Sequence, residues 1–556
     1  MRRIGFGLIA VVAAVMACKS NSGTPAAGSR GSITVVMAYG SEKKTWIDES
    51  VQAFEASGAK TAAGKRIHID ARAMGSGEAA DAIADGTLKP TVFSPASGAY
   101  VAVLNEKWLS NPGHVKPISP AGEPVVLSPI VIAMWKPMAE ALGWPEKSLG
   151  WNDLLSVAAN PKGWGAKGHP EWGTFKLGHT HPEFSNSGLL AVLAEAYAGA
   201  KKTRGLTADD LSSKETTAML AKVEGTIVHY GKSTGFFADK MLARGPGYLS
   251  CAILYENLVV ESYSKNVGAP FPLVAIYPVE GTFWSDHPFA ILDAEWVGPE
   301  DREAAQAFLT FLKTKPRQER ALALGFRPAD PAIATTAPID AAHGVDPKQP
   351  QTALEVPDGK VLRKLVEVWS ATKKSTDVIL VVDKSGSMNG KPLEQAKQGA
   401  KAFLDDLTDR DEVSILYFDQ QLYPLVGPLS LGKGKAALVS SIDGMIASGG
   451  TALYDAIAEA YRIAKLRAEK EPGKIHAVVV MTDGADTNST LSLESLQRNF
   501  NGEDRMASPV KIFTIAYGDQ AQTKVLTQIA DAAQGSSSKG STQDIVQVYR
   551  DMASFF

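Results

Sequence analysis

Cysteine is nearly absent from this sequence, because its 556 residues include only two, Cys18 and Cys251. That scarcity excludes a disulfide-stapled scaffold and a cysteine-rich zinc or iron–sulfur protein. A strong net charge is lacking as well: 57 basic residues face 60 acidic ones, and the formal net charge is −3. The chain therefore has no long-range basic field to attract nucleic acid, and we expect no nucleic acid among its partners.

Long apolar runs are also scarce, and none beyond the first residues approaches the roughly 20 residues that cross a membrane. The run at 4–17 is shorter than that; it follows two arginines and ends in an alanine directly before Cys18. Basic residues, a short apolar run and a small residue are typical of a secretory signal peptide. We therefore expect a signal peptide at 1–17 and the rest of the chain outside the cytoplasm.

The residues VMAC, which end in Cys18, resemble the lipobox of bacterial lipoproteins. The resemblance implies that Cys18 becomes the N-terminus and carries lipid, palmitate included, which would anchor the protein to the cell membrane or outer membrane of a bacterium. Residues 18–31 are polar and rich in Gly and Ser, as in a flexible tether. An ordinary signal peptide with an incidental cysteine, or an uncleaved anchor, is the alternative.

Two regions in which strands alternate with helices are separated by a stretch rich in Pro, Ala and Asp. The alternation predicts an α/β protein with parallel sheets. We place the first region at 32–335, a linker at 336–376 and the second region at 377–556. Strands of the second region, such as DVILVVD and IHAVVVMTD, are almost entirely apolar, which predicts a doubly wound sheet covered by helices on both faces.

Oxygen-bearing side chains follow the apolar strands of the second region, at the edge where open α/β sheets place their ligands. One strand ends in a DxSxS pattern, another ends in TDG, and a threonine precedes a helix; the residues are Asp383, Ser385, Ser387, Thr451 and Asp483. Two carboxylates and three hydroxyls, without histidine or thiolate, favour Mg²⁺, or Mn²⁺ or Ca²⁺, over zinc. Helix capping and turn chemistry without a metal is the alternative.

These three elements, in this order, resemble the metal-ion-dependent adhesion site (MIDAS) of a von Willebrand factor A domain. The resemblance covers 377–556 and implies a Rossmann-like fold in which the five side chains hold the ion. Because Mg²⁺ keeps waters, one position would remain for an acidic residue of a protein partner. We expect both carboxylates on loops outside the sheet core, so that removing Asp383 leaves the metal-free domain as stable or more so, and we expect Lys384 to place a cation near the site.

The first region resembles type 2 extracellular solute-binding proteins, of the branch that includes molybdate binders. The matching stretches are VVMAYGSEKKTWI, MGSGEAADAIADGTLKPTVFSPAS, GHTHPEFSNSGLLA, CAILYENLV and LGFRPA. The resemblance implies a periplasmic-binding-protein-like domain of two lobes with a solute between them, and a transporter membrane component as the usual partner. We expect strands to cross between the lobes near 124–136 and 277–288.

Polar residues follow the expected strands of the first region and would face the cleft between its lobes. Hydroxyls and backbone N–H groups at helix N-termini bind polar or anionic solutes without a fixed counter-charge. The candidate ligands of the solute are Ser41, Ser76, Gly77, Ser185, Asn186, Ser187, Tyr255 and Glu256. Helix capping is the alternative for these serines.

Two further motifs fail in their context. Ser233 lies in GKSTG, which matches both the nucleophile elbow of hydrolases and the end of a P-loop. The preceding glycine has the wrong spacing for a P-loop. His229, directly upstream, is not where a hydrolase has its catalytic histidine. His179 and His181 are two residues apart with Glu183 close behind, and they lack a dedicated fourth group for a metal, so a role in the cleft or at the surface is favoured. With no nucleophile and base in view, we expect no enzyme.

Together these features predict a lipid-anchored extracytoplasmic binding protein. Its first module would bind a solute, and its second would adhere to a protein through a metal ion. The alternative is an adhesion or envelope-assembly scaffold whose solute-binding fold no longer binds a small molecule.

Overall fold

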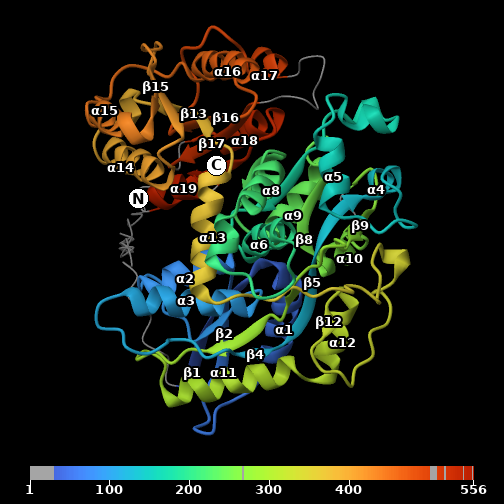
Figure 1. Cartoon of the computed structure of the whole chain (residues 1–556). Helices are drawn as coiled ribbons and strands as arrows, with labels where there is room; N and C mark the ends of the chain where they lie inside the picture. Colours follow the sequence, from blue (N-terminus) through green and yellow to red (C-terminus); the bar gives the residue numbers. More distant parts are fainter. Residues whose placement is uncertain (1–30, 266–267, 501–509, 519–520, 542–543, 554) are drawn as a thin grey trace, which may run out of the picture.

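The chain forms three α/β units: two lobes, between which the first region passes back and forth, and a C-terminal domain (Figure 1). The computed structural model describes residues 31–265, 268–500, 510–518, 521–541, 544–553 and 555–556. The expected signal peptide, Cys18 and all of the expected tether except Gly31 lie outside the described residues. Within the described part, none of the helices has the length and apolar character needed to pass through a bilayer.

The first lobe is built on a sheet of five strands in the order β2-β1-β3-β11-β4. β1 pairs in parallel with β2 and with β3, so the turns that follow these strands lie at one edge of the sheet. The strands are β1 Ser32–Gly40, β2 Arg66–Met74, β3 Val92–Ser94, β4 Glu123–Pro124 and β11 Pro288–Ile291. The helices are α1 Lys44–Ala56, α2 Ser76–Ala84, α3 Gly98–Ser110, α11 Pro299–Leu312 and α12 Lys315–Ala323.

The second lobe is built on a sheet of seven strands, in which β10-β5-β8-β6-β7 form the main path and β9 and β12 also pair with β5. The strands are β5 Val126–Trp135, β6 Leu177–Thr180, β7 Ile227–Gly231, β8 Cys251–Tyr255, β9 Leu273–Ile276, β10 Trp284–Ser285 and β12 Arg327–Pro328. The helices are α4 Lys136–Ala141, α5 Trp151–Ala158, α6 Asn186–Ala200, α7 Ala208–Ser212, α8 Lys214–Glu224, α9 Thr234–Arg244 and α10 Glu256–Ser262.

The chain passes between the two lobes at both expected places. It leaves the first sheet at β4 and enters the second at β5, and it returns from β10 of the second sheet to β11 of the first. The two-lobed architecture expected for the first region is therefore confirmed. Cys251 lies fully buried in β8, as a small apolar residue of the core.

The C-terminal domain has six strands in the order β15-β14-β13-β16-β17-β18, all parallel except β15. The strands are β13 Thr376–Asp383, β14 Glu412–Phe418, β15 Val426–Ser430, β16 Ile475–Thr482, β17 Val510–Tyr517 and β18 Ser537–Gly540. The helices are α14 Lys391–Asp406, α15 Leu431–Asp443, α16 Leu453–Lys470, α17 Leu493–Phe500, α18 Thr523–Ala532 and α19 Ile545–Ala553.

Both faces of this sheet are covered, as its apolar strands predict. Along β13, Val378 and Leu380 belong to the core on the side of α14 and α19, whereas Ile379 and Val381 belong to the core on the side of α16 and α18. Successive residues of a strand point to opposite faces, so a strand buried on both faces must be apolar at every position. The doubly wound fold is confirmed.

The segment expected to be a linker contains a helix that packs against both lobes. α13 (Gly359–Thr372) lies against α3 of the first lobe and against α6, α7 and α8 of the second, and Figure 1 shows it running on toward the C-terminal domain. Its buried side chains are Leu362, Leu365, Val368 and Trp369. Because these residues recur at helical spacing, they form one apolar stripe that must be covered. The end of the segment is thus a helix, α13, that packs across both lobes.

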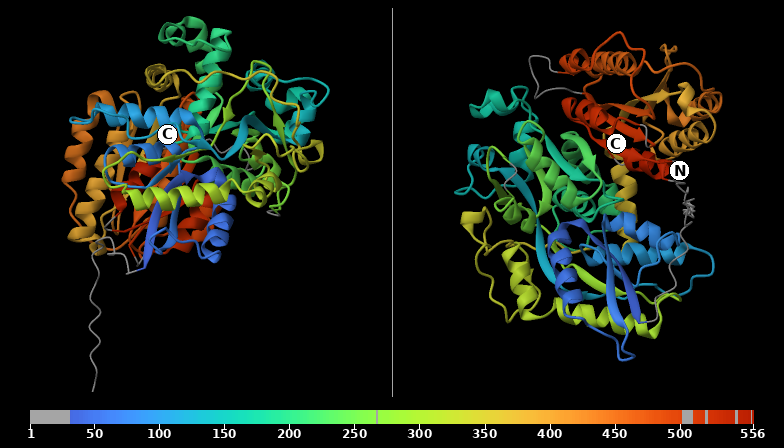
Figure 2. Two further views of the ribbon diagram at one scale, coloured as in Figure 1. Left: turned by 90° about the horizontal axis from the view of Figure 1, so that it is seen from below. Right: turned by 180° about the vertical axis from the view of Figure 1, so that it is seen from behind.

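The C-terminal domain packs against the second lobe (Figure 2). The ring of Trp369 lies 5.4 Å from that of Tyr230 and 4.7 Å from that of His181, and the Tyr230 N–H donates to Phe555 O at 3.3 Å. The Lys232 ammonium bridges Asp551 of the C-terminal domain, at 2.7 Å, and Glu78 of the first lobe, at 2.8 Å. All three units therefore meet around one lysine.

A group of basic residues is buried in the same interface. Lys511 Nζ of β17 lies 2.6 Å from His229 Nδ1 of β7. Burial, followed by the charges of Lys240, Lys176 and Arg244, holds the pKa of Lys511 well below its usual range. Burial and Arg244 lower the pKa of Lys240 to about 7. The folded interface therefore disfavours the protonated forms of Lys511 and Lys240, which the unfolded chain favours.

We expect the free energy of unfolding to rise from pH 7 to about pH 9.5. Over this range the unfolded chain keeps both lysine protons, with pKa values near 10.5, while burial favours their loss from the folded chain, so unfolding takes up protons and higher pH opposes it. One such group contributes at most about 1.4 kcal/mol per pH unit. Thermal denaturation at the two pH values measures the effect in the wild type and in Lys511→Met.

The substitution at Lys511 should reduce this pH dependence, whereas Lys433→Met, at an exposed lysine of α15, should leave it unchanged. An equal pH dependence in the wild type and in Lys511→Met would contradict the account of the interface.

Candidate metal and ligand sites

The central strands of the C-terminal sheet place two carboxylates at one edge. β13 ends at Asp383 and the parallel neighbour β16 ends at Thr482, directly before Asp483. The Asp383 carboxylate accepts the Ser385 N–H at 2.7 Å and the Thr482 hydroxyl at 2.5 Å. These two bonds fix the orientation of Asp383 at the end of its strand.

Hydroxyl groups complete the same cluster. Ser385 Oγ lies 3.0 Å from Ser387 Oγ, and the Ser387 hydroxyl donates to Asp483 Oδ1 at 2.7 Å. A Cβ placed on Gly484 would lie 3.6 Å from Thr451 Oγ1 and 3.9 Å from Ser387 Oγ, so those two hydroxyls flank the same glycine. The structure thus brings all five predicted metal ligands to one edge of the sheet.

The donor set fits a hard divalent cation. Adjacent oxygen ligands of octahedral Mg²⁺, at bonds of about 2.1 Å, lie about 3.0 Å apart. The Ser385–Ser387 and Ser387–Asp483 separations of 3.0 and 2.7 Å are close to that value. Burial is the main cause that raises the pKa of Asp383 and of Asp483, and a bound cation would offset the cost of both charges.

Two expectations about this site are wrong. Asp383 does not lie on a loop outside the core. It is the last residue of β13 and is fully buried, because its carboxylate accepts hydrogen bonds from Ser385 and Thr482 at the end of the strand. Lys384 does not direct its charge at the cluster. Its ammonium binds Asp419 at 2.8 Å and lies 4.0 Å from the ring centre of Tyr423, since that pair offers both an anion and an aromatic face.

In the first region, polar side chains of the two lobes meet and bind each other. The Ser41 hydroxyl of the first lobe donates to Ser233 Oγ of the second at 3.1 Å, and the Gly235 N–H donates to Ser41 Oγ at 3.1 Å. The Ser97 hydroxyl of the first lobe donates to Asn186 Oδ1 at 2.6 Å. The lobes are therefore in direct contact through the groups expected to face a solute.

The remaining residues of the second lobe extend this network. Asn186 Nδ2 donates to the Tyr255 hydroxyl at 2.9 Å. The hydroxyl of Thr234 lies 3.1 Å from Ser185 Oγ and 2.7 Å from Ser187 Oγ. Four of the predicted ligands, all buried, thus join one polar layer at the start of α6 and α9.

Three predicted ligands have other contacts. Ser76 Oγ accepts the Ala96 N–H within the first lobe, and the Gly77 N–H donates across the cleft to Phe184 O at 3.0 Å. Glu256 forms a two-bond ion pair with Arg327, at 2.8 and 2.7 Å, and accepts the Tyr277 hydroxyl. Because those partners occupy its oxygens, Glu256 holds the fold of the second lobe.

Sequence reasoning missed Ser97, Ser233, Thr234 and Lys43. The Lys43 ammonium is fully buried beside the cleft and donates to Glu42 at 2.9 Å and to Ser94 O at 3.1 Å. A usable signal was present at 231–235. The residues GKSTG run from the end of β7 into the start of α9, the same arrangement of strand, polar turn and helix that marked the other candidates.

Comparison with known families agrees with this architecture. Residues 35–327 match the model of the family described as bacterial extracellular solute-binding protein. The chain belongs to that family. Residues 377–548 match the von Willebrand factor type A domain, a domain type that commonly binds a divalent metal at a MIDAS. A chain with these two domain types fits a role in binding or adhesion, and neither type is generally catalytic.

Individual relatives cover parts of the chain. An uncharacterized protein of Mycobacterium tuberculosis is 23% identical over 426 residues, which are 73% of this chain and 60% of that protein. An uncharacterized protein of Synechocystis sp. is 29% identical over 29% of this chain and 37% of its own length. Human inter-alpha-trypsin inhibitor heavy chain H4 is 27% identical over 29% of this chain and 17% of its own length. The chain thus spans less than two thirds of each of these relatives.

Two solved structures are similar to separate parts of the chain. A periplasmic thiamin binding protein covers 63% of this chain and 99% of its own, at 12% identity and a TM-score of 0.44. A von Willebrand factor type A protein from Catenulispora acidiphila covers 33% of this chain and 43% of its own, at 23% identity and a TM-score of 0.29.

Replacing Asp383 by alanine should destabilise the metal-free protein. The Ser385 N–H would lose its acceptor, and the Thr482 hydroxyl would keep only the long bond to Gly484 O at 3.5 Å. An unsatisfied buried donor costs about 1–3 kcal/mol. Asp383→Asn keeps one oxygen for the Ser385 N–H, and its amide N–H can donate to the Thr482 hydroxyl, so this variant should unfold close to the wild type. Urea unfolding of the full chain in EDTA measures both variants, with Asp409→Ala, at an exposed aspartate, as control. Equal stability of Asp383→Ala and the wild type would show that these bonds contribute nothing.

Proposed function

We propose that this protein attaches to a partner protein outside the cytoplasm through a divalent ion, with Mg²⁺ the first candidate and Mn²⁺ or Ca²⁺ the others. The ion would be held by Asp383, Ser385, Ser387, Thr451 and Asp483. The observation that supports this proposal is the convergence of those oxygen atoms at one sheet edge, at spacings that suit such an ion. When bound, the ion would offer a coordination position to an acidic side chain of the partner.

The charges of the proposed ligands suit a divalent ion that bridges two proteins. The two carboxylates carry a formal charge that balances one divalent cation, and the hydroxyls add dipoles without further charge. Asp419 and Tyr423 hold the Lys384 ammonium away from the cluster, so the nearest cation of the same loop does not oppose the metal. A partner carboxylate would then form a charge-assisted contact, which is stronger than an ordinary surface salt bridge.

Partner binding should require both the metal and Asp383. The full chain, immobilised, is incubated with native envelope extract in Mg²⁺ or in EDTA, and the captured proteins are identified by mass spectrometry. A partner of this site should be captured by the wild type and by Asp409→Asn in Mg²⁺ only, and should be absent with Asp383→Asn.

The same three proteins are titrated with Mg²⁺ and Mn²⁺ in a calorimeter, where Asp383→Asn should lose at least about tenfold in affinity. Capture that persists with Asp383→Asn in EDTA would mean that the C-terminal domain binds through another surface.

For the first region we propose binding of a polar or anionic solute between the lobes. The supporting observation is the layer of buried hydroxyl and amide groups contributed by both lobes, among them Ser41, Asn186 and Ser187. The alternative, a scaffold that binds no small molecule, is favoured by a different observation. The lobes bond each other directly, and α13 packs against both of them, including an ion pair between Arg363 and Glu106.

A calorimetric screen of the full chain against oxyanions, sugars and amino acids separates these two functions. If a solute binds, Ser187→Ala should weaken it by about 0.5–1.5 kcal/mol for a neutral hydrogen bond, or about 1.5–3 kcal/mol for a charged ligand. Ser156→Ala, at an exposed serine of α5, should have no effect. Binding of none of these classes would support the scaffold.

We also propose that a lipid on Cys18 anchors the protein at the cell envelope. The proposal is supported by the apolar run, the small residue and the polar stretch around that cysteine. Intact-mass measurement of the protein extracted from membranes should show loss of residues 1–17 and addition of lipid. Unchanged membrane retention of Cys18→Ser would contradict it.

A further inference from the structure

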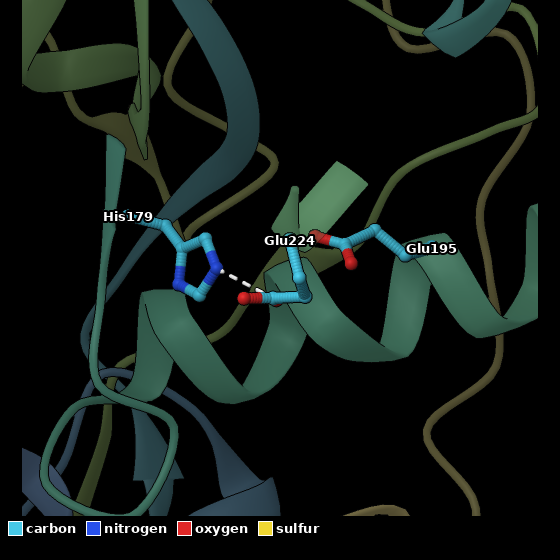
Figure 3. A group of neighbouring side chains, drawn as sticks. All are labelled: His179, Glu195 and Glu224. Carbon is cyan, nitrogen blue, oxygen red and sulfur yellow. Dashed lines mark hydrogen bonds and ion pairs between the residues drawn. The ribbon is translucent and has the colours of Figure 1, made fainter. Parts of the chain in front are cut away.

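A group of buried side chains in the second lobe has no part in the sites described above. His179 of β6, Glu195 of α6 and Glu224 at the end of α8 bring one imidazole nitrogen and two carboxylate oxygens within 4.8 Å of one another. All three residues are fully buried. Figure 3 shows the ring and the two carboxylates turned toward a common point from three different elements.

The hydrogen bonds around the cluster leave His179 Nε2 and carboxylate oxygens of both glutamates directed at its centre. His179 Nδ1 lies 2.7 Å from Thr180 O, and because a carbonyl oxygen only accepts, Nδ1 carries the proton and donates. Nε2 then faces Glu224 Oε1 at 3.0 Å, while Glu224 Oε2 accepts the Tyr230 hydroxyl at 2.6 Å. Both oxygens of Glu195 are buried without any hydrogen-bond partner. The bonds of His179 and Glu224 therefore leave Glu195 without a partner in the cluster.

No lysine or arginine of the described residues forms an ion pair with this cluster. Lys373 and Lys374 interact electrostatically with Glu224, but their side-chain nitrogens donate to Phe556 O at 2.6 Å and to Ile227 O at 3.1 Å. Two carboxylates without a cation are costly in an apolar interior, so a positive charge at this point would relieve the cluster.

We propose that His179, Glu195 and Glu224 bind a divalent first-row transition ion, Zn²⁺ foremost, at a structural site inside the second lobe. One imidazole nitrogen and two carboxylate oxygens are donors that Zn²⁺ accepts, and the two carboxylates neutralise its charge. Ligands of tetrahedral zinc lie about 3.3 Å apart, close to the 3.0 Å between His179 Nε2 and Glu224 Oε1. The fourth position is left for a water molecule.

The surroundings of the cluster match those of metal sites. The bond from His179 Nδ1 to a main-chain oxygen fixes the ring so that Nε2 is free to coordinate, and the Tyr230 hydroxyl orients Glu224 in the same way. The ion would tie β6, α6 and α8 together. Tyr230 also packs on Trp369, so the ion would support the surface on which α13 and the C-terminal domain dock.

The test measures metal content in three versions of the full chain. Wild type, Glu195→Gln and Asp383→Asn are produced in medium supplied with zinc, manganese and iron, washed with EDTA to remove accessible ions, and analysed by inductively coupled plasma mass spectrometry. Asp383→Asn is the control for the C-terminal site. Wild type and Asp383→Asn should retain about one transition ion per chain, and Glu195→Gln should retain at least about tenfold less.

A wild type without retained transition metal, or equal retention in Glu195→Gln, would overturn the proposal. The melting temperature gives a second measurement, because glutamine has the shape of glutamate without its charge. With the ion as a structural link, Glu195→Gln should melt below the wild type. Without an ion, the same substitution removes an unpaired buried carboxyl, so a melting temperature equal to or above that of the wild type would also overturn the proposal.

Discussion

The pairing of the two central strands of the C-terminal sheet is the constraint on which the proposed metal site depends. β13 and β16 run parallel with Val382 opposite Met481. Asp383 and Asp483 follow these two residues closely, so they lie at the same edge of the sheet. That arrangement puts two carboxylates in a partly desolvated place, where burial opposes their charge. The hydroxyls of Ser385, Ser387 and Thr451 then complete a set of oxygen donors. The chemistry of the site follows from the register of the sheet and from the need to neutralise these charges.

The three units of the molecule are connected more closely than a chain of tethered modules would be. α13 packs against both lobes, and Trp369 at its end meets Tyr230 of the second lobe. Lys232 binds Glu78 of the first lobe and Asp551 of the C-terminal domain. The contact between the lobes and the docking of the C-terminal domain therefore share one residue, Lys232.

Much of the fold could be predicted from the sequence, because strands buried on both faces are continuously apolar and their ends carry the polar residues. The five proposed metal ligands could be found for that reason. The packing of α13 could not, since its stripe of Leu362, Leu365 and Trp369 lies beside a proline-rich stretch that hides the helical period. The burial of Asp383 and the turn of Lys384 toward Asp419 depend on contacts between residues distant in sequence.

The buried cluster of the second lobe shows the same limit. Glu195 is a single glutamate in the apolar helix GLLAVLAEAY, and that is a signal of an unusual interior site. Its partners His179 and Glu224 come from separate elements, so only the folded chain shows that they meet.

The central claim, that the C-terminal domain holds a divalent ion between Asp383 and Asp483, is tested most directly by crystals of the protein grown with Mn²⁺. An anomalous difference map collected near the manganese absorption edge should show a peak within bonding distance of both carboxylates and of the Ser385, Ser387 and Thr451 hydroxyls. A well-ordered site without anomalous signal, at millimolar Mn²⁺, would contradict the account.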